Sequence, residues 1–342
     1  MTGTRPAGRD RGGSAGMDSI HWETPSWSDL AAGGHQRRRW FAHWFGEVPL
    51  SALQWVLFHV LRVMPVDAVS GFGGRLGRIA GPLFFPLGVR VAEVNVRWLQ
   101  PTWSAGKVRE VVLGHYENIG RVKAEFAILH RLMRNGRIRI ENAETMKAAL
   151  ETGPVILAGS HLANWEILAP VLASLDVPAF DIFEPQPSRF QTRIALKVRE
   201  ECAAPGTVFF TRDSNAPREA LRWLKAGRAM VIFCDETIDG ASRVPFFGRP
   251  PHTRGNYAFA VRFARLSRAT LLPFHVERRG GCHFTLRFGT PIRPGTPERS
   301  RDDLMDEILQ LDRVLDATIR ARLDTWWWLH WGFAEVPYPF EH

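Results

Sequence analysis

The fold is decided by the stretch PVILAGSHLANWEIL, residues 154–168. Its apolar run Val155–Ala158 has the length and composition of a buried strand, and residues 165–175 have the pattern of a helix. Gly159 and Ser160, between the two, are residues that favour turns. A strand, a turn and a helix in this order are typical of α/β proteins.

Strands and helices continue to alternate after this stretch. We predict further strands at 178–183, 208–210 and 229–234, and helices at about 188–202, 215–226, 255–265 and 301–322. Residues 270–277 and 283–288, joined by Arg-Arg-Gly-Gly, are expected to form a hairpin. The sequence therefore predicts an α/β fold with a mostly parallel central sheet flanked by helices.

Composition divides the 342 residues into three parts. Residues 1–36 are rich in Gly, Ser, Arg and Asp, and we expect a disordered tail without a secretory signal. Residues 37–66 are apolar and rich in Trp, but charged residues such as Glu47 and Arg62 interrupt them, so a clean spanning helix is not supported. A core helix and a membrane-associated helix in the headgroup region both remain possible, and the Trp residues favour the second.

The third part, residues 67–342, is the expected α/β domain, with a basic helical part at 67–150 and a core at 151–342. The net charge is +9, and residues 62–140 alone hold 13 Lys and Arg against 5 Asp and Glu. Such a surface suits an anionic partner: nucleic acid, an anionic membrane or an acidic carrier protein. The three cysteines are widely spaced, which suits a reducing compartment.

The segment GFGGRLG (71–77) is rich in glycine, like a nucleotide-binding loop. It follows no predicted strand, and its spacing does not match the dinucleotide fingerprint. Close packing of two helices explains these glycines more simply.

His161 and Glu166 are the first candidate catalytic pair. Positions five apart on an α-helix differ by about 140° around its axis, so these two cannot meet within one helix. They can meet if His161 lies in the turn and Glu166 in the first turn of the following helix. A carboxylate on one imidazole nitrogen would leave the other nitrogen free to take a proton. By spacing alone, two polar residues at the rim of a core are the other interpretation.

A second acidic site follows the strand at 229–234, with Asp235, Glu236 and Asp239. Carboxyl ends of parallel strands share one edge of a sheet, so both acidic sites are expected to line one cleft. A cation site and a capped structural loop are the alternatives. In VPFFGRPPHT (244–253), Phe246 and Phe247 are expected to form an apolar wall of that cleft or to pack in the core.

Several motifs together resemble one family. GSHLANWEIL (159–168), Asp235, VPFFGRPPHT (244–253) and TWWWLHWGFAE (325–335) occur in the order and spacing of the late acyltransferases of lipid A biosynthesis, within the lysophospholipid acyltransferase superfamily. The segment RVAEVNVRWL (90–99) is also similar. The resemblance covers roughly residues 45–335.

The resemblance implies a set of site residues. It gives the catalytic histidine as His161 and the catalytic carboxylate as Glu166, with supporting roles for Arg199 and Asp235. The turn residue Asn164 is expected to support the site, and Phe246 and Phe247 are expected to contact the acyl chain.

The resemblance also implies a reaction. An O-acyltransferase of this family moves a fatty acyl chain from an acyl-carrier-protein thioester to a hydroxyl of a lipid A precursor. It requires no metal and no cofactor. The expected partners are an acyl carrier protein, the glycolipid precursor and an anionic membrane, with no nucleic acid. The expected location is the inner membrane, with the site facing the cytoplasm.

Two departures from the family pattern bear on the acceptor. Relatives often have Tyr-Arg-Pro where this chain has Phe183-Glu184-Pro185, and Gln or His where it has Glu236. The same transfer to another glycolipid or glycerolipid therefore remains an alternative. A non-catalytic membrane- or nucleic-acid-binding protein is a third hypothesis.

Overall fold

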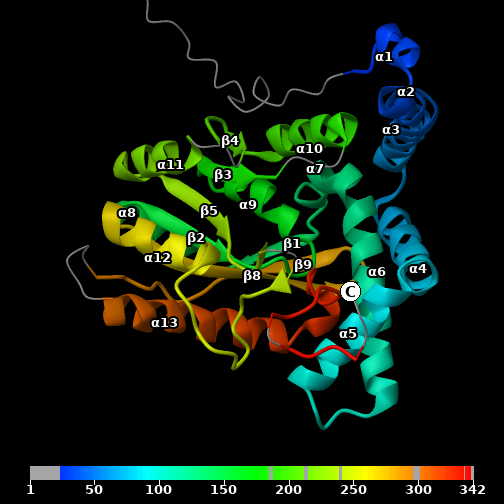
Figure 1. Cartoon of the computed structure of the whole chain (residues 1–342). Helices are drawn as coiled ribbons and strands as arrows, with labels where there is room; N and C mark the ends of the chain where they lie inside the picture. Colours follow the sequence, from blue (N-terminus) through cyan, green and yellow to red (C-terminus); the bar gives the residue numbers. More distant parts are fainter. Residues whose placement is uncertain are drawn as a thin grey trace, which may run out of the picture.

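The chain is organised around one seven-stranded sheet (Figure 1). A computed structural model describes residues 24–184, 188–211, 215–238, 241–295, 301–334 and 336–339. The strand order is β1-β9-β8-β2-β5-β3-β4, and β8 with β9 is the one antiparallel pair among these neighbours. The strands are β1 (Ile138–Glu141), β2 (Val155–Gly159), β3 (Ala179–Phe183), β4 (Val208–Thr211), β5 (Ala229–Phe233), β8 (Thr270–Gly280) and β9 (His283–Phe288).

The predicted α/β fold and its mostly parallel sheet are confirmed, as is the 270–288 hairpin. The sheet also contains β1, which the sequence analysis did not predict. A separate two-stranded ribbon is formed by β6 (Thr237–Ile238) and β7 (Ala241–Ser242).

The apolar strands are buried because helices cover both faces of the sheet. All five residues of β2 are buried. Val155 and Leu157 pack in one core cluster, while Ile156 and Ala158 pack in another on the opposite face. This alternation follows from the two-residue period of a strand, and burial on both faces explains why the strand has no polar positions.

The helices of the α/β core are α8 (Ala143–Thr152), α9 (Leu168–Ser174), α10 (Arg189–Cys202), α11 (Ala216–Lys225), α12 (Gly255–Ser267) and α13 (Arg301–Arg320). Residues of α8, α9 and α10 pack in the first cluster, and those of α11, α12 and α13 in the second. A short 3-10 helix, η3 (Trp165–Ile167), lies between β2 and α9.

The residues before the sheet are helical. The elements are α1 (Trp27–Ala32), α2 (Gly34–Phe41), the π-helix η1 (Ala42–Glu47), α3 (Val48–Val63), α4 (Val66–Phe84), α5 (Pro86–Leu99), α6 (Ala105–Glu125), the 3-10 helix η2 (Phe126–Ile128) and α7 (Leu129–Leu132). Residues 1–23 of the expected tail lie outside the described residues, whereas much of 24–36 is helical, in α1 and the start of α2.

A helix that crosses a bilayer must be both long and apolar. No single one of the described helices meets both requirements. The pair α4 and α5 meets them only jointly, and its two helices are bent by 100° where they join.

Three of the four glycines of GFGGRLG, Gly73, Gly74 and Gly77, lie where α4 crosses α6, which confirms the helix-packing interpretation. A methyl group on Gly73 would collide with the Gly120 carbonyl oxygen, at 2.5 Å, and with the Ala124 side chain, at 2.6 Å. One on Gly77 would collide with the Tyr116 carbonyl and with Gly120. The two backbones approach closely because Gly77 of α4 and Gly120 of α6 face each other without side chains.

The crossing gives a stability prediction. Gly77→Ala should lower the free energy of unfolding by about 1–3 kcal/mol, because overpacking forces the two helices apart. Gly71→Ala is the matched control, since its added methyl group meets nothing within 4 Å. That variant should be neutral or more stable by up to about 1 kcal/mol. Thermal unfolding of both variants checks this, and equal stabilities would contradict the packing argument.

Candidate active site

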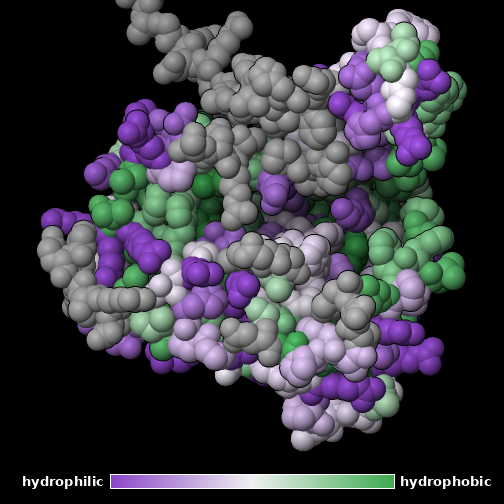
Figure 2. Space-filling view, in the orientation of Figure 1, coloured by the Kyte–Doolittle hydropathy of each residue, from purple (hydrophilic) through white to green (hydrophobic). Residues whose placement is uncertain are grey.

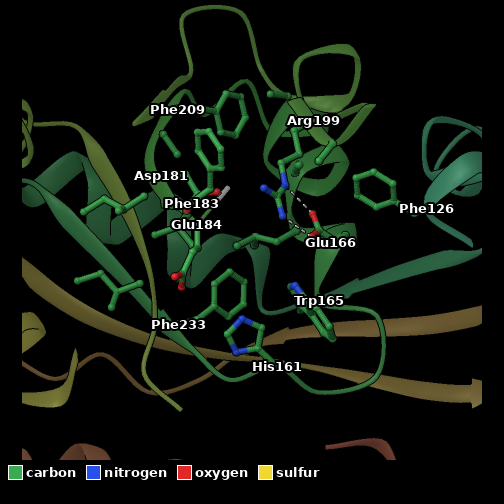
Figure 3. Close-up of a pocket in the computed structure, with 18 of the residues that line it drawn as sticks. Phe126, His161, Trp165, Glu166, Asp181, Phe183, Glu184, Arg199, Phe209 and Phe233 are labelled. Carbon is green, nitrogen blue, oxygen red and sulfur yellow. Dashed lines mark hydrogen bonds and ion pairs between the residues drawn. The ribbon is translucent and has the colours of Figure 1, made fainter. Parts of the chain in front are cut away.

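A cavity of about 880 Å³ opens at the carboxyl-terminal edge of β2, β3 and β5. His161, Trp165 and Phe233 lie together at one end of it in Figure 3. The imidazole packs 4.5 Å from the Phe233 ring and 4.9 Å from the Trp165 ring, centroid to centroid. The histidine is thus held between aromatic rings in the wall of a large pocket.

Asp235 is the carboxylate that orients His161. Its Oδ1 lies 2.8 Å from Nδ1 of the ring, and its Oδ2 accepts the His161 backbone N–H at 2.7 Å. A carboxylate only accepts hydrogen bonds, so the ring contact requires the proton on Nδ1. Trp328 Nε1 lies 3.3 Å from the same nitrogen, but a protonated Nδ1 cannot accept from it. In the neutral ring, Nε2 therefore keeps its lone pair.

The sheet register explains why these two residues meet. β2 and β5 are adjacent and parallel, and Gly159 is paired with Phe233 at their last shared position. His161 and Asp235 each lie two residues beyond that pair. Both strands end at the same edge, so the two side chains emerge side by side.

A third hydrogen bond to Asp235 comes from the C-terminal segment. Trp326 Nε1 donates to Oδ2 at 2.8 Å, and both side chains are fully buried. The backbone of this segment also pairs with the turn: Trp327 N–H donates to the His161 carbonyl, and Ala163 N–H to that of Thr325. The C-terminal aromatic segment is therefore part of the site's frame.

The expected contact between Glu166 and His161 is wrong. Glu166 turns toward α10, where Arg199 donates to its two oxygens at 2.6 and 3.0 Å (Figure 3). Asp235 already occupies the Nδ1 position of His161, and η3 directs the Glu166 side chain to the other side of Trp165. Glu166 and Arg199 instead form a half-buried ion pair in the pocket wall.

Two other charged residues line this part of the pocket. Burial raises the pKa of Asp181 to about 6, and the nearby Arg199 opposes that rise. Lys123 lies over the Trp327 ring at 5.3 Å, and burial lowers the pKa of its ammonium group while Glu166 opposes that shift. Both shifts have the same cause, because the pocket walls exclude much of the surrounding water.

Asn164 connects the turn after β2 to Glu125 at the end of α6. Its Nδ2 donates to Glu125 Oε2 at 2.9 Å, and the preceding Ala163 has a left-handed backbone with φ of 51°. Glu125 is fully buried and also accepts two hydrogen bonds from Arg278. No local pattern pointed to Glu125 or Arg278, since they lie 39 and 114 residues from Asn164 in the chain.

Phe246 and Phe247 do not line the cavity, so their expected contact with an acyl chain is corrected. Each is 2% exposed. Phe246 packs against Tyr257 and His252, and Phe247 against Trp326 and Phe333. The core-packing alternative holds here, because a turn buries both rings.

The described acidic residues after β5 do not form one cluster with Asp235. Glu236 lines the pocket and accepts the Asn256 backbone N–H at 2.7 Å, and Asp239 lies outside the described residues. Within the described ranges, no group of three or more His, Cys, Asp or Glu side chains is arranged to hold a metal ion. Glu184, the departure from the family pattern, also lines the pocket.

Comparison with known proteins gives one family. Residues 47–334 match the sequence pattern of the bacterial lipid A biosynthesis acyltransferases. A comparison with curated protein sequences gave no match. Among solved structures, the chain is similar to the 1-acyl-sn-glycerophosphate acyltransferase of Thermotoga maritima, with 13% identity over 70% of this chain and 97% of that chain and a TM-score of 0.34.

Turnover measurements can distinguish the roles of Asp235 and Glu166. Asp235→Asn should lower kcat for acyl transfer by roughly 10²- to 10⁴-fold, because an amide no longer fixes the Nδ1–H tautomer of His161. Glu166→Gln is the matched control, since it leaves that contact intact and should reduce kcat less. Steady-state kinetics of the two folded variants measure which of them loses more kcat. A larger loss in Glu166→Gln would indicate that Glu166 is the orienting group.

Asp181 gives a pH prediction. Its raised pKa means that the folded protein retains a proton that the unfolded chain releases, so the contribution of Asp181 to stability falls as the pH rises from about 4 to about 6. Asp181→Asn lacks this titration. The stability of the variant relative to the parent should therefore rise across that window and level off above it. Denaturant unfolding at several pH values measures this, and a constant difference would be inconsistent with a buried carboxyl.

Proposed function

Because the chain belongs to the bacterial lipid A biosynthesis acyltransferase family, we propose that it moves a fatty acyl chain from an acyl-carrier-protein thioester to a hydroxyl of a lipid A precursor. The family supports acyl transfer to a lipid acceptor. The donor, the acceptor and the residue roles are our proposal. The observation that carries it is the His161–Asp235 pair in the wall of a largely apolar pocket.

His161 acts as the general base. Its Nε2 takes the proton of the acceptor hydroxyl as the oxygen attacks the thioester carbonyl, and Asp235 stabilises the imidazolium that forms. The C–S bond then breaks, and the imidazolium returns the proton to the leaving thiolate. The backbone N–H groups at the start of η3 are candidates to stabilise the oxyanion. The acyl group passes directly from donor to acceptor.

The pocket has the size and lining for a hydrocarbon chain. Its volume of about 880 Å³ is within the range of about 300–1,000 Å³ usual for ligand sites. Beyond the Glu166–Arg199 pair, much of its wall consists of apolar side chains from α9, β3, α10, the loop after α10, and β4. They are Leu168, Leu172, Ala179, Ala195, Ala203, Ala204 and Phe209. The positive charge of Arg199 is paired with the carboxylate of Glu166. We therefore assign this pair a structural role in the wall and no phosphate-binding role.

The charge of the chain suits the proposed partners. A net charge of +9 attracts both an acidic carrier protein and an anionic membrane, and such attraction weakens as salt rises. We place the enzyme at the cytoplasmic side of the inner membrane, where acyl carrier protein and lipid precursor meet.

A second acceptor class is favoured by one observation. Glu184 lines the pocket where relatives often have an arginine. A carboxylate there repels the phosphate of a lipid A precursor, whereas it can accept hydrogen bonds from sugar hydroxyls. The second candidate is therefore the same transfer to another glycolipid or to a glycerolipid.

The decisive experiment is mass spectrometry of lipid A from a strain that lacks the gene. We expect lipid A without one secondary acyl chain, restored by the parent gene and not by His161→Ala. Unaltered lipid A in the deletion strain would reject this acceptor. Purified enzyme with one acyl-carrier-protein donor and a panel of glycolipid and glycerolipid acceptors then distinguishes the second candidate.

A further inference from the structure

Helix α3 has two faces of different character. Ser51, Gln54, Phe58 and Leu61 lie at helical spacing and are buried or half-buried. The remaining face is apolar and yet exposed to solvent, with exposed fractions of 44% to 80% for Leu50, Leu53, Trp55, Val56, Leu57, Val60 and Val63. A helix that exposes such a face is typical of an interaction with lipid or with another apolar surface.

The exposed apolar surface continues beyond α3. On α4 and α5 and at the bend between them it includes Phe72, Leu76, Ile79, Leu83, Phe84, Phe85 and Leu87. In Figure 2 apolar residues gather along the right-hand edge of the molecule, beside α3 and α4. Exposed Arg75 and Arg90 lie on the same two helices. An apolar surface with basic residues beside it matches an anionic bilayer better than a protein partner.

The inner face of α3 forms a wall of the catalytic pocket. Gln54 and Phe58 line the same cavity as His161, and Gln191 and Ile194 of α10 line it opposite them. One helix therefore has the pocket on one side and the proposed membrane surface on the other. The boundary between α3 and α10 adjoins the pocket, because residues of both helices line it.

The contact between α3 and α10 at the pocket is slight. Gln191 Nε2 donates to Gln54 Oε1 at 3.1 Å, a hydrogen bond between two neutral groups. Stronger contacts hold the C-terminal end of α3. Arg62 pairs there with Glu201 at the far end of α10 at 2.7 Å, and Arg131 donates to the carbonyls of Arg62 and Met64. A bond to a charged group is roughly twice as strong as a neutral one. The helix is thus firmly fixed at its C-terminal end and weakly joined to α10 beside the pocket.

We propose that an acyl chain of the lipid acceptor enters the pocket from the bilayer between α3 and α10, at the Gln54–Gln191 contact. This proposal rests on the proposed function and specifies how its acceptor reaches His161. The acceptor's polar head stays at the membrane surface, while its chain passes the neutral Gln54 and Gln191 side chains and enters the pocket beside Phe58 and Ile194. The carrier-protein donor, being soluble, does not use this route.

Cross-linking across the two helices tests the route. Gln54→Cys/Gln191→Cys is treated with a short, reductant-cleavable bis-methanethiosulfonate, since two glutamine side chains span a gap too wide for a direct disulfide. The three native cysteines are free and buried, so the reagent should find the introduced pair. The readouts are transfer to acceptor in anionic vesicles and slow hydrolysis of the acyl-carrier-protein thioester without acceptor.

We expect the cross-link to lower transfer at least tenfold, to leave thioester hydrolysis unchanged, and to be reversed by reductant. The same double variant, before treatment and again after reductant, is the reference for both readouts, so that any effect of the two substitutions themselves cancels. Unchanged transfer in the cross-linked enzyme would overturn the route, and so would equal loss of transfer and hydrolysis. Failure of the proposed function is distinguishable, because the parent enzyme would then not acylate the vesicle acceptor at all.

Discussion

The rest of the site depends on the hydrogen bonds that the Asp235 carboxylate accepts. This carboxylate is fully buried, and a buried charge is stable only when its oxygens are well hydrogen-bonded. The His161 ring, the His161 backbone and the Trp326 indole supply the three N–H groups that satisfy it. These donors belong to two segments that are 165 residues apart. Strand β5, the turn after β2 and the C-terminal segment are therefore fixed by one side chain.

The carboxylates of Asp235 and Glu166 have different roles in the site. Asp235 sets the tautomer of the histidine, while Glu166 and Arg199 brace the wall between the histidine and the small apolar side chains deeper in the pocket. Each partner of this ion pair neutralises the charge of the other, so the pair itself leaves no net charge in the pocket wall. The polar chemistry and the apolar binding volume can thus share one cavity.

Much of the fold was predictable because the buried strands are apolar throughout. The runs at Val155–Ala158 and 229–234 locate β2 and β5, and turn residues locate the hairpin. Strand β1 was missed, since its four residues alternate charged and apolar side chains and resemble a surface segment. Helical residues within 24–36 were missed because their composition is that of a tail.

The site was predictable only in part. The sequence indicates that His161 and Asp235 each follow a strand. Their pairing depends on β2 and β5 being neighbours in the sheet, and the spatial order of the strands cannot be deduced from their order in the sequence. Glu166 is close to His161 in sequence, and the family resemblance also implies it as the catalytic carboxylate. Phe246 and Phe247 were expected at the cleft, yet their burial depends on Trp326 and Tyr257, which lie far along the chain.

The C-terminal segment also sets when the enzyme becomes active. A protein leaves the ribosome N-terminus first, so α3 and α4 emerge long before Thr325, Trp326 and Trp327. Until those last residues appear, Asp235 lacks its indole donor and the His161 turn lacks two of its backbone partners. The early helices, which carry the membrane surface that we propose, are therefore synthesised while the active site is still incomplete.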